Sequence, residues 1–256
     1  ATTEIYTLSL HDALPIWHSR FTDTVYQHGI AQDDAERNAG GKAQQRSCGK
    51  STLKQCSCII TAFSGKKCII MNGYCFEQYL IDNCSPTLAS LKTANLFNYR
   101  YSSTDELNKA VERWNKELSG KGITVTVLRK RENTALIYVY RAKRLAKDLS
   151  RPGVERFMKC HGYENTDIER CLEVLGGKLA KSDLFPHEIG LFLGYPLGDV
   201  IGFIDNGGKN SRCTGCWKVY CNECEAMRTF ARFDKCRAVY QKMWANGRSI
   251  VQLTVA

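Results

Sequence analysis

Two β-rich runs decide the fold of this chain: Ile123-Thr-Val-Thr-Val-Leu128 and Ala135-Leu-Ile-Tyr-Val-Tyr140. β-branched and aromatic residues dominate both runs, and a short charged stretch, 129–134, separates them. Residues of these types fit the pleated surface of a sheet, and two such runs joined by a short polar connection are typical of a β-hairpin. The sequence therefore predicts an antiparallel pair of strands at about 123–140, in the middle of the folded part of the chain.

Helical patterns lie on both sides of the predicted hairpin. Ser103-Thr-Asp-Glu106 has the spacing of a capping box, in which the serine hydroxyl and the glutamate carboxylate satisfy backbone N–H groups at a helix start. Pro86, after a serine, and Pro186 each predict a proline in the first turn of a helix. The longest predicted helix spans 223–244. Since the clearest strands form a hairpin, we expect an α+β fold: a single domain with a small, largely antiparallel sheet covered by several helices.

The first 70 residues have a different character. Ordinary codons for residues 1–16 spell a widely used sequencing-library adapter in frame, so this stretch resembles a translated adapter. Residues 17–70 show no sustained apolar period, and we expect them to be a disordered, non-native or upstream-translated segment. Met71 precedes the first organised helical pattern and is the expected initiator. The predicted domain is therefore 71–256.

The composition of 71–256 limits the class of protein. This part holds 28 Lys and Arg against 20 Asp and Glu, and the excess is dispersed. No apolar stretch reaches the length of about 20 residues that a membrane span needs, which argues against a membrane protein. Its nine cysteines are an odd number without a secretion signal, which favours reduced thiols and a cytoplasmic location.

Several motifs of the predicted domain carry a family resemblance. They are Phe185-Pro-His-Glu-Ile-Gly-Leu-Phe-Leu-Gly-Tyr-Pro196 and the segments 84–89, 136–141, 199–204, 215–220 and 247–256. In these motifs the chain resembles an uncharacterised, mainly clostridial, bacterial family catalogued as domain of unknown function 3793. The resemblance spans 71–256, includes none of 1–70, and implies no activity, cofactor or catalytic residue.

One group of residues predicts a binding site for a small anion or a nucleotide. His187 and Glu188 follow Pro186, and we expect them in the first turn of a helix whose free N–H groups attract negative charge. Lys92, Lys218 and Tyr220 are expected to complete the pocket. The alternative is that these residues only cap and pack the helices. On this hypothesis the protein is a cytoplasmic ligand-binding or regulatory protein, and whether it is also an enzyme stays open.

Four cysteines suggest an alternative, a thiol-redox or metal-binding protein. Cys213 and Cys216 form one CxxC pair, and Cys221 and Cys224 form a second. Only four residues separate the pairs, fewer than in zinc ribbons, so an extended connection places Cys216 and Cys221 too far apart for one zinc ion. The second pair lies between a predicted strand and a predicted helix, where a helix start lowers the pKa of a thiol. Buried or incidental thiols remain the other interpretation.

A third function class rests on charge. Basic residues gather in 129–147, which begins with Arg129-Lys-Arg131 and includes Arg141 and Arg144. A nucleic-acid-binding module would need these residues to form one continuous basic face. Such runs are more often solvated surface or turns, so this function is not the favoured one.

We predict that removing 1–70 leaves the stability of the domain unchanged, because this segment is expected to bury little surface against 71–256. The melting temperature of the 71–256 fragment should match that of the full chain within about 2 °C, less than the shift that roughly 1 kcal/mol causes in a domain of this size. Differential scanning calorimetry of both proteins measures it. A larger decrease would show that part of 1–70 belongs to the fold.

Overall fold

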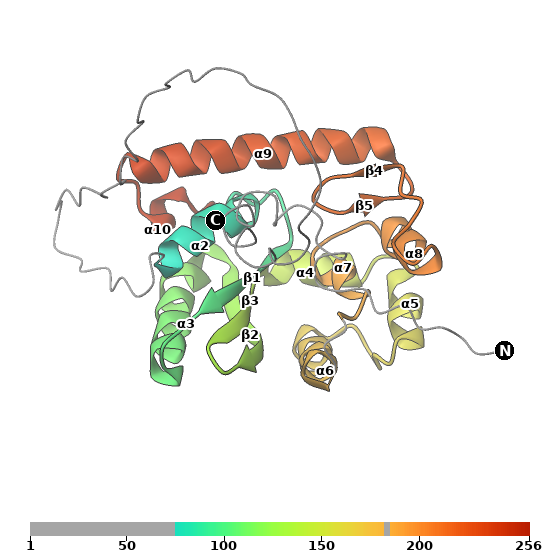
Figure 1. Ribbon diagram of the computed structural model, residues 1–256, viewed down its shortest axis with the longest axis horizontal. Helices are drawn as coiled ribbons and strands as arrows, with labels where there is room; N and C mark the ends of the chain where they lie inside the picture. The colour runs from blue at the N-terminus through green and yellow to red at the C-terminus, as the bar shows by residue number, and fades with distance from the viewer. Residues whose placement is uncertain (1–74, 182–184) are drawn as a thin grey trace, which may run out of the picture. The chain divides into compact units, whose positions relative to one another are not determined.

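The computed structural model describes residues 75–181 and 185–256 (Figure 1). The predictions for 1–70 and for Met71 as initiator lie outside these residues. The described part is α+β, as the sequence predicts. Its α-helices are α2 (Phe76–Leu88), α3 (Thr104–Leu118), α4 (Ala142–Leu149), α5 (Val154–Cys160), α6 (Ile168–Lys181), α7 (Ile189–Phe192), α8 (Leu197–Asp205), α9 (Glu223–Ala245) and α10 (Ile250–Leu253), with a 3-10 turn η1 (Ser119–Lys121), and its strands are β1 (Ala94–Arg100), β2 (Ile123–Arg131), β3 (Thr134–Arg141), β4 (Cys213–Thr214) and β5 (Lys218–Val219).

The predicted hairpin forms the centre of the main sheet. Strands β2 and β3 pair antiparallel, β1 pairs with the other edge of β3, and the order is β1-β3-β2. Both hairpin strands extend beyond their expected ends, because Lys130 and Arg131 still pair with Ala135 and Thr134. The connection is therefore a two-residue turn instead of the six-residue loop expected from the charges. Charged side chains at a strand end are compatible with pairing, since only the backbone forms the ladder.

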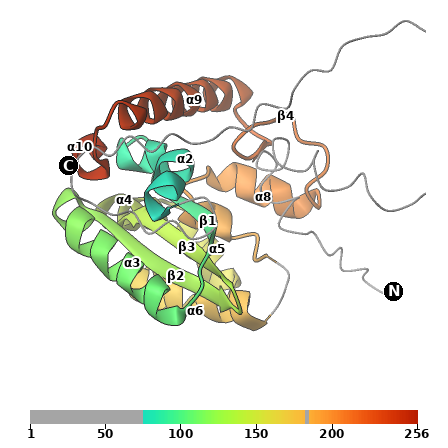
Figure 2. The same ribbon diagram turned by 60° about the vertical axis from the view of Figure 1, so that its left-hand side comes forward.

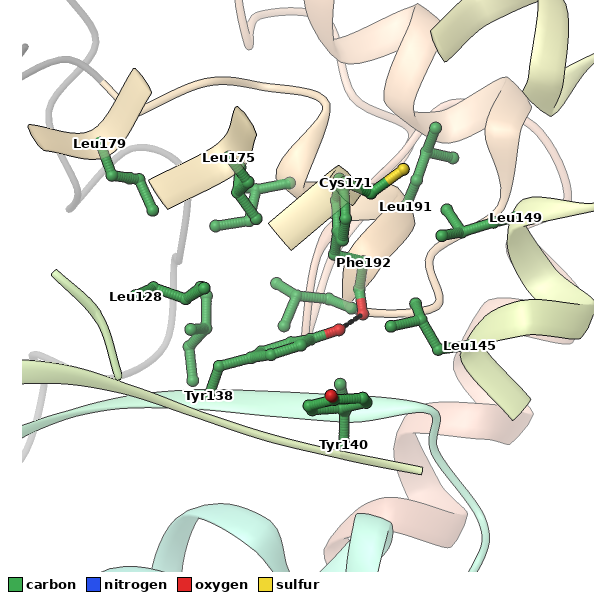
Figure 3. Packing of buried hydrophobic residues seen from close by; sticks show 14 of the residues in the cluster. Leu128, Tyr138, Tyr140, Leu145, Leu149, Cys171, Leu175, Leu179, Leu191 and Phe192 are labelled. Atoms are coloured by element: carbon green, nitrogen blue, oxygen red, sulfur yellow. Dashed lines mark hydrogen bonds between the residues drawn. The ribbon is translucent and has the colours of Figure 1, made fainter. Parts of the chain in front are cut away.

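The central strand β3 is buried on both faces. Leu136 and Tyr138 pack into a cluster that also contains residues of α4 to α8, whereas Ile137 and Val139 pack into a cluster with α2, α3 and α10. In Figure 3 the Tyr138 side chain points into the first cluster, and its hydroxyl donates a hydrogen bond of 2.6 Å to the carbonyl of Phe192. Successive side chains of a strand point to opposite faces, so the unbroken apolar run of β3 supplies both clusters.

A bulge at Leu128 adapts β2 to the two clusters. Val127 pairs with Ile137 and Arg129 pairs with Leu136, so Leu128 is the extra residue. Its buried side chain joins the cluster of Leu136 and Tyr138. An extra residue of this kind changes which face the following side chains take and increases the local twist. Figures 1 and 2 show α3 on one face of the sheet and α6 on the other.

The prediction that Pro86 begins a helix is wrong. Pro86 lies in the last turn of α2, and the Ser85 hydroxyl donates a hydrogen bond to the carbonyl of Ile81 within that helix. The carbonyl of Pro86 accepts the N–H groups of Leu91 (2.8 Å) and Lys92 (3.1 Å), which closes the helix end. A proline this close to a helix end removes one hydrogen bond, and the burial of the residues around it holds the turn.

The predicted cap of α3 is confirmed in its first half. The Ser103 hydroxyl accepts the N–H of Glu106 at 3.2 Å. The carboxylate of Glu106 accepts the N–H of Ser102 (3.0 Å), one residue before the expected partner. Two backbone donors at the helix start are satisfied, as a capping box requires, with a shift of one residue.

Arg141, the last residue of β3, is buried and connects three parts of the chain. Its guanidinium donates to the carbonyls of Thr87 (2.7 Å) and Leu88 (2.8 Å) at the end of α2, to that of Lys121 (3.1 Å) in η1, and to that of Val255 (2.6 Å). Carbonyls at a helix end lack partners within the helix and carry partial negative charge, so they suit a cation. Arg141 thus adds a second donor to the carbonyls of Thr87 and Leu88, which also accept the N–H groups of Ser90 and Val255, and it connects this helix end to η1.

We predict that Arg141→Met lowers the free energy of unfolding by about 3 kcal/mol, because it removes a buried guanidinium that donates four hydrogen bonds to carbonyls on three segments. Arg141→Lys should recover only part of this, since one ammonium cannot reach carbonyls on three segments. Urea unfolding followed by circular dichroism measures both variants. Arg156→Met, at an exposed position of α5, is the matched control and should change the free energy by less than about 0.5 kcal/mol. Equal stability of the Arg141→Met and control variants would contradict the anchoring role.

Candidate functional site

A pocket lies between α7, α8 and β5. It contains about 480 Å³ of empty space, part of which is open to solvent. Most of its wall is aromatic or aliphatic, and three residues with ionisable side chains also line it: His187, Asp199 and Lys218. The apolar side chains are Phe185, Ile189, Leu193, Tyr195, Val200, Phe203 and Trp217. Small-molecule sites in proteins commonly have this mixture of apolar walls with few polar groups.

Close packing of α7 against α8 shapes the pocket. Gly190 in α7 touches the start of α8, and a Cβ atom at this position would lie 2.8 Å from Val200 Cγ2 and 3.2 Å from the Tyr195 ring. Only glycine permits this approach. Val200 and Tyr195 consequently meet α7 and form part of the pocket wall.

The helix expected at Pro186 begins three residues later. Helix α7 spans only Ile189–Phe192, and His187 and Glu188 precede it as a turn. The N–H of Ile189 bonds to the carbonyl of Pro186 (3.1 Å), and that of Gly190 bonds to the carbonyl of His187 (3.2 Å). The N–H groups of Ile189 and Gly190 are therefore engaged within the turn and are not free for a ligand.

His187 is placed at the pocket. Its ring lies edge-on to Phe203, with 5.1 Å between ring centroids. Burial lowers the pKa of His187 below its usual value of 6.5, and the opposing effect of the Glu188 carboxylate is smaller. The imidazole is thus mainly neutral at pH 7, and its Nδ1 is a buried polar atom without a hydrogen-bond partner among the described residues.

Lys218 extends to the same pocket from β5. Its ammonium donates to the carbonyl of Gly208 at 2.9 Å and lies 5.7 Å from the centre of the Phe203 ring. A lysine ammonium has three N–H groups, so one hydrogen bond leaves two for other acceptors. The structure therefore brings His187 and Lys218, two of the five predicted ligand residues, to one concavity.

The other three predicted residues do not line this pocket. Glu188 is buried and forms an ion pair with Lys178, and its carboxylate also accepts a hydrogen bond of 3.3 Å from Tyr163. Lys92 is buried with its ammonium 5.2 Å from the centre of the Tyr195 ring, and this burial lowers the pKa of Lys92 to about 8. Tyr220 packs on Gly202, where a Cβ atom would lie 2.5 Å from the Tyr220 Cβ.

Asp199 organises the pocket, and sequence reasoning did not identify it. This buried carboxylate, in the first turn of α8, accepts hydrogen bonds from the Trp217 indole (2.8 Å) and from the N–H groups of Tyr220 (2.8 Å) and Cys221 (2.9 Å). It therefore fixes β5 and the start of α9 against α8. The available signal was an acid placed directly before an apolar run, Val200 to Ile204, since a charge that such a run buries requires partners.

The four cysteines of the predicted metal or redox site lie from β4 to the start of α9 as free thiols. Within the described ranges, no three His, Cys, Asp or Glu side chains are grouped so that they could hold a metal ion. Cys221 precedes α9, as predicted, and its pKa is raised, first by burial and then by the Asp199 carboxylate. A thiol activated by a helix start has a lowered pKa. This direction does not favour the redox hypothesis, which stays a prediction.

Three arginines of the basic 129–147 region serve the fold. Arg141 is the buried anchor, Arg144 donates to the carbonyl of Ser90, and the Arg129 guanidinium lies 6.0 Å from the centre of the Phe185 ring. Of these three, only Arg141 is buried, so its charge alone is withdrawn from the surface that nucleic acid would need. Separately, none of the described helices is both long enough and apolar enough to cross a membrane.

Comparison with known proteins gives the family of the chain. Neither the curated proteins nor the solved structures that were compared contain a match to it. One family profile does match, over residues 80–254, which include the whole three-stranded sheet, the pocket and α9. The chain therefore belongs to the family described as protein of unknown function (DUF3793).

Proposed function

We propose that this protein binds a small organic ligand that combines a flat apolar ring with an anionic group, as a nucleotide does, and that it acts as a ligand-binding or regulatory protein. The pocket of His187 and Lys218 is the observation that carries the proposal. Its wall is mostly aromatic and aliphatic, and a few polar side chains converge on it, as is usual for small-molecule sites. The ring would occupy the apolar part of the pocket, and the anionic group would meet the lysine.

The aromatic wall is held in place before any ligand arrives. Trp217 is fixed by its hydrogen bond to Asp199, stacks on Tyr195 with 4.9 Å between ring centroids, and meets Phe230 edge-on at 4.5 Å. A wall that is already ordered costs little further conformational entropy on binding. Flat rings gain additional energy from such aromatic surfaces through offset or edge-on contacts. This rigidity supports a ligand with a planar ring.

The polar groups of the pocket favour a negative charge. Lys218 has two N–H groups beyond its bond to Gly208, and the neutral His187 ring offers a further polar atom. Asp199, the only acid that lines the pocket among the described residues, is engaged by three donors. A carboxylate or phosphate at Lys218 would form charge-assisted hydrogen bonds, which are stronger than neutral ones.

We predict that the full chain binds adenosine 5′-monophosphate more tightly than adenosine, which has the same ring and no charge. Lys218→Gln should weaken the binding of the monophosphate by about tenfold and leave adenosine binding nearly unchanged, because a hydrogen bond to a charged group contributes about 1.5–3 kcal/mol. Isothermal titration calorimetry with both compounds measures the two affinities.

Lys147→Gln is the matched control, since it removes the same charge at an exposed position of α4 outside the pocket. It should leave both affinities as they are in the original protein. If neither compound binds, or if both lysine variants weaken the monophosphate equally, the proposed ligand class is wrong.

A further inference from the structure

The solvent-facing side of α9 carries a row of cations. Arg228, Arg232, Lys235 and Lys242 are all exposed, and they are spaced four, three and seven positions apart. Residues at these spacings lie on one face of a helix. The opposite face of α9 is buried through Ala226, Phe230 and Phe233. We call these four residues the α9 basic row.

The α9 basic row is long, straight and supported from behind. From Arg228 to Lys242 it covers 14 positions, or about 21 Å at the α-helical rise per residue. Figures 1 and 2 show α9 as a continuous helix that lies on α2, and Gln241 of α9 donates a hydrogen bond of 2.8 Å to Asp82 of α2. The spacing of the four cations is therefore fixed by packed structure.

Acidic side chains are nearly missing from this part of α9. Between Ala226 and Ala245 the sequence contains one acid, Asp234, and it pairs with Arg237 at 3.1 Å. For the part of the chain that the structure describes, no ion pair is recorded for any residue of the α9 basic row. A helix exposed only for solubility usually mixes both signs of charge, so this segregation points to an acidic partner.

We propose that the α9 basic row binds the phosphate backbone of double-helical DNA. Phosphates are evenly spaced along a duplex, and Arg and Lys on one rigid line can each meet one of them. This surface is separate from the ligand pocket and from the 129–147 region. It would supply backbone contacts, which position a protein on DNA without reading its sequence.

Other acidic partners fit the α9 basic row less well. Membrane-surface helices need a broad apolar face, whereas Met227 and Val239 are the only large apolar side chains exposed on the described part of α9. Single-stranded nucleic acid needs aromatic stacking platforms, and the exposed residues of α9 include none. Protein–protein interfaces are enriched in aromatic side chains and depleted of charged ones at their centre, and the α9 basic row has the opposite composition. The wide major groove of B-form DNA admits a helix, but the narrow one of duplex RNA does not.

The test measures how salt affects the binding of the full chain to a fluorescent 20-base-pair DNA duplex. Four phosphate contacts predict a slope of about −3.6 for the logarithm of affinity against the logarithm of salt concentration, or roughly a fiftyfold loss between about 50 and about 150 mM salt. Arg232→Gln combined with Lys235→Gln should halve the slope, because two contacts remain. Both positions are exposed, so circular dichroism of the variant should match that of the original chain.

A control variant separates the α9 basic row from net charge. Lys109→Gln combined with Lys116→Gln removes the same charge from exposed positions of α3 and should leave the slope unchanged. An equal decrease in both double variants, or no binding at about 50 mM salt, would overturn the proposal. So would tighter binding of duplex RNA, of a polyglutamate peptide or of phosphatidylserine vesicles than of the DNA duplex.

Discussion

The buried guanidinium of Arg141 is the interaction on which the arrangement of this fold depends. A β-strand, two helical segments and the last residues of the chain meet at this one side chain, which bonds to the carbonyls of Thr87, Leu88, Lys121 and Val255. A buried cation normally requires an acid, but here the partial charges of helix ends take that role. The C-terminal end of β3 is consequently hydrogen-bonded to α2 and η1 through Arg141. This contact adds to the packing of β3 along its length.

At the pocket, Asp199 links α8 to the segment that contains β5. This buried acid is satisfied by an indole and two backbone N–H groups, so it acts as a fixed connection between α8 and β5. The pocket of His187 and Lys218 lies on this connection. Its walls come from segments that are far apart in sequence, and their relative position depends on one carboxylate. Asp199 therefore both holds α8 against the β5 segment and positions the walls of the pocket.

The sequence predicted elements whose causes are local, and it failed where the cause lies elsewhere in the fold. The hairpin and the Ser103 cap follow from residue types within a few positions, and both are present. Pro86 was assigned to a helix start because proline favours that position, but burial of its neighbours extends α2 past it. Arg141 reads as surface charge, since its partners are backbone carbonyls that leave no mark in a sequence. Asp199 could not be linked to Trp217 before the fold brought them together.

The two faces of the sheet also differ in the kind of charge that they bury. The Arg141 guanidinium faces backbone carbonyls, which carry only partial charge. On the opposite face the buried Glu188 carboxylate pairs with the partly exposed ammonium of Lys178 and accepts the hydroxyl of Tyr163. One layer is therefore joined by a charge and dipoles, and the other by two full charges that reach towards solvent. Dissolved salt should consequently weaken the second contact more than the first.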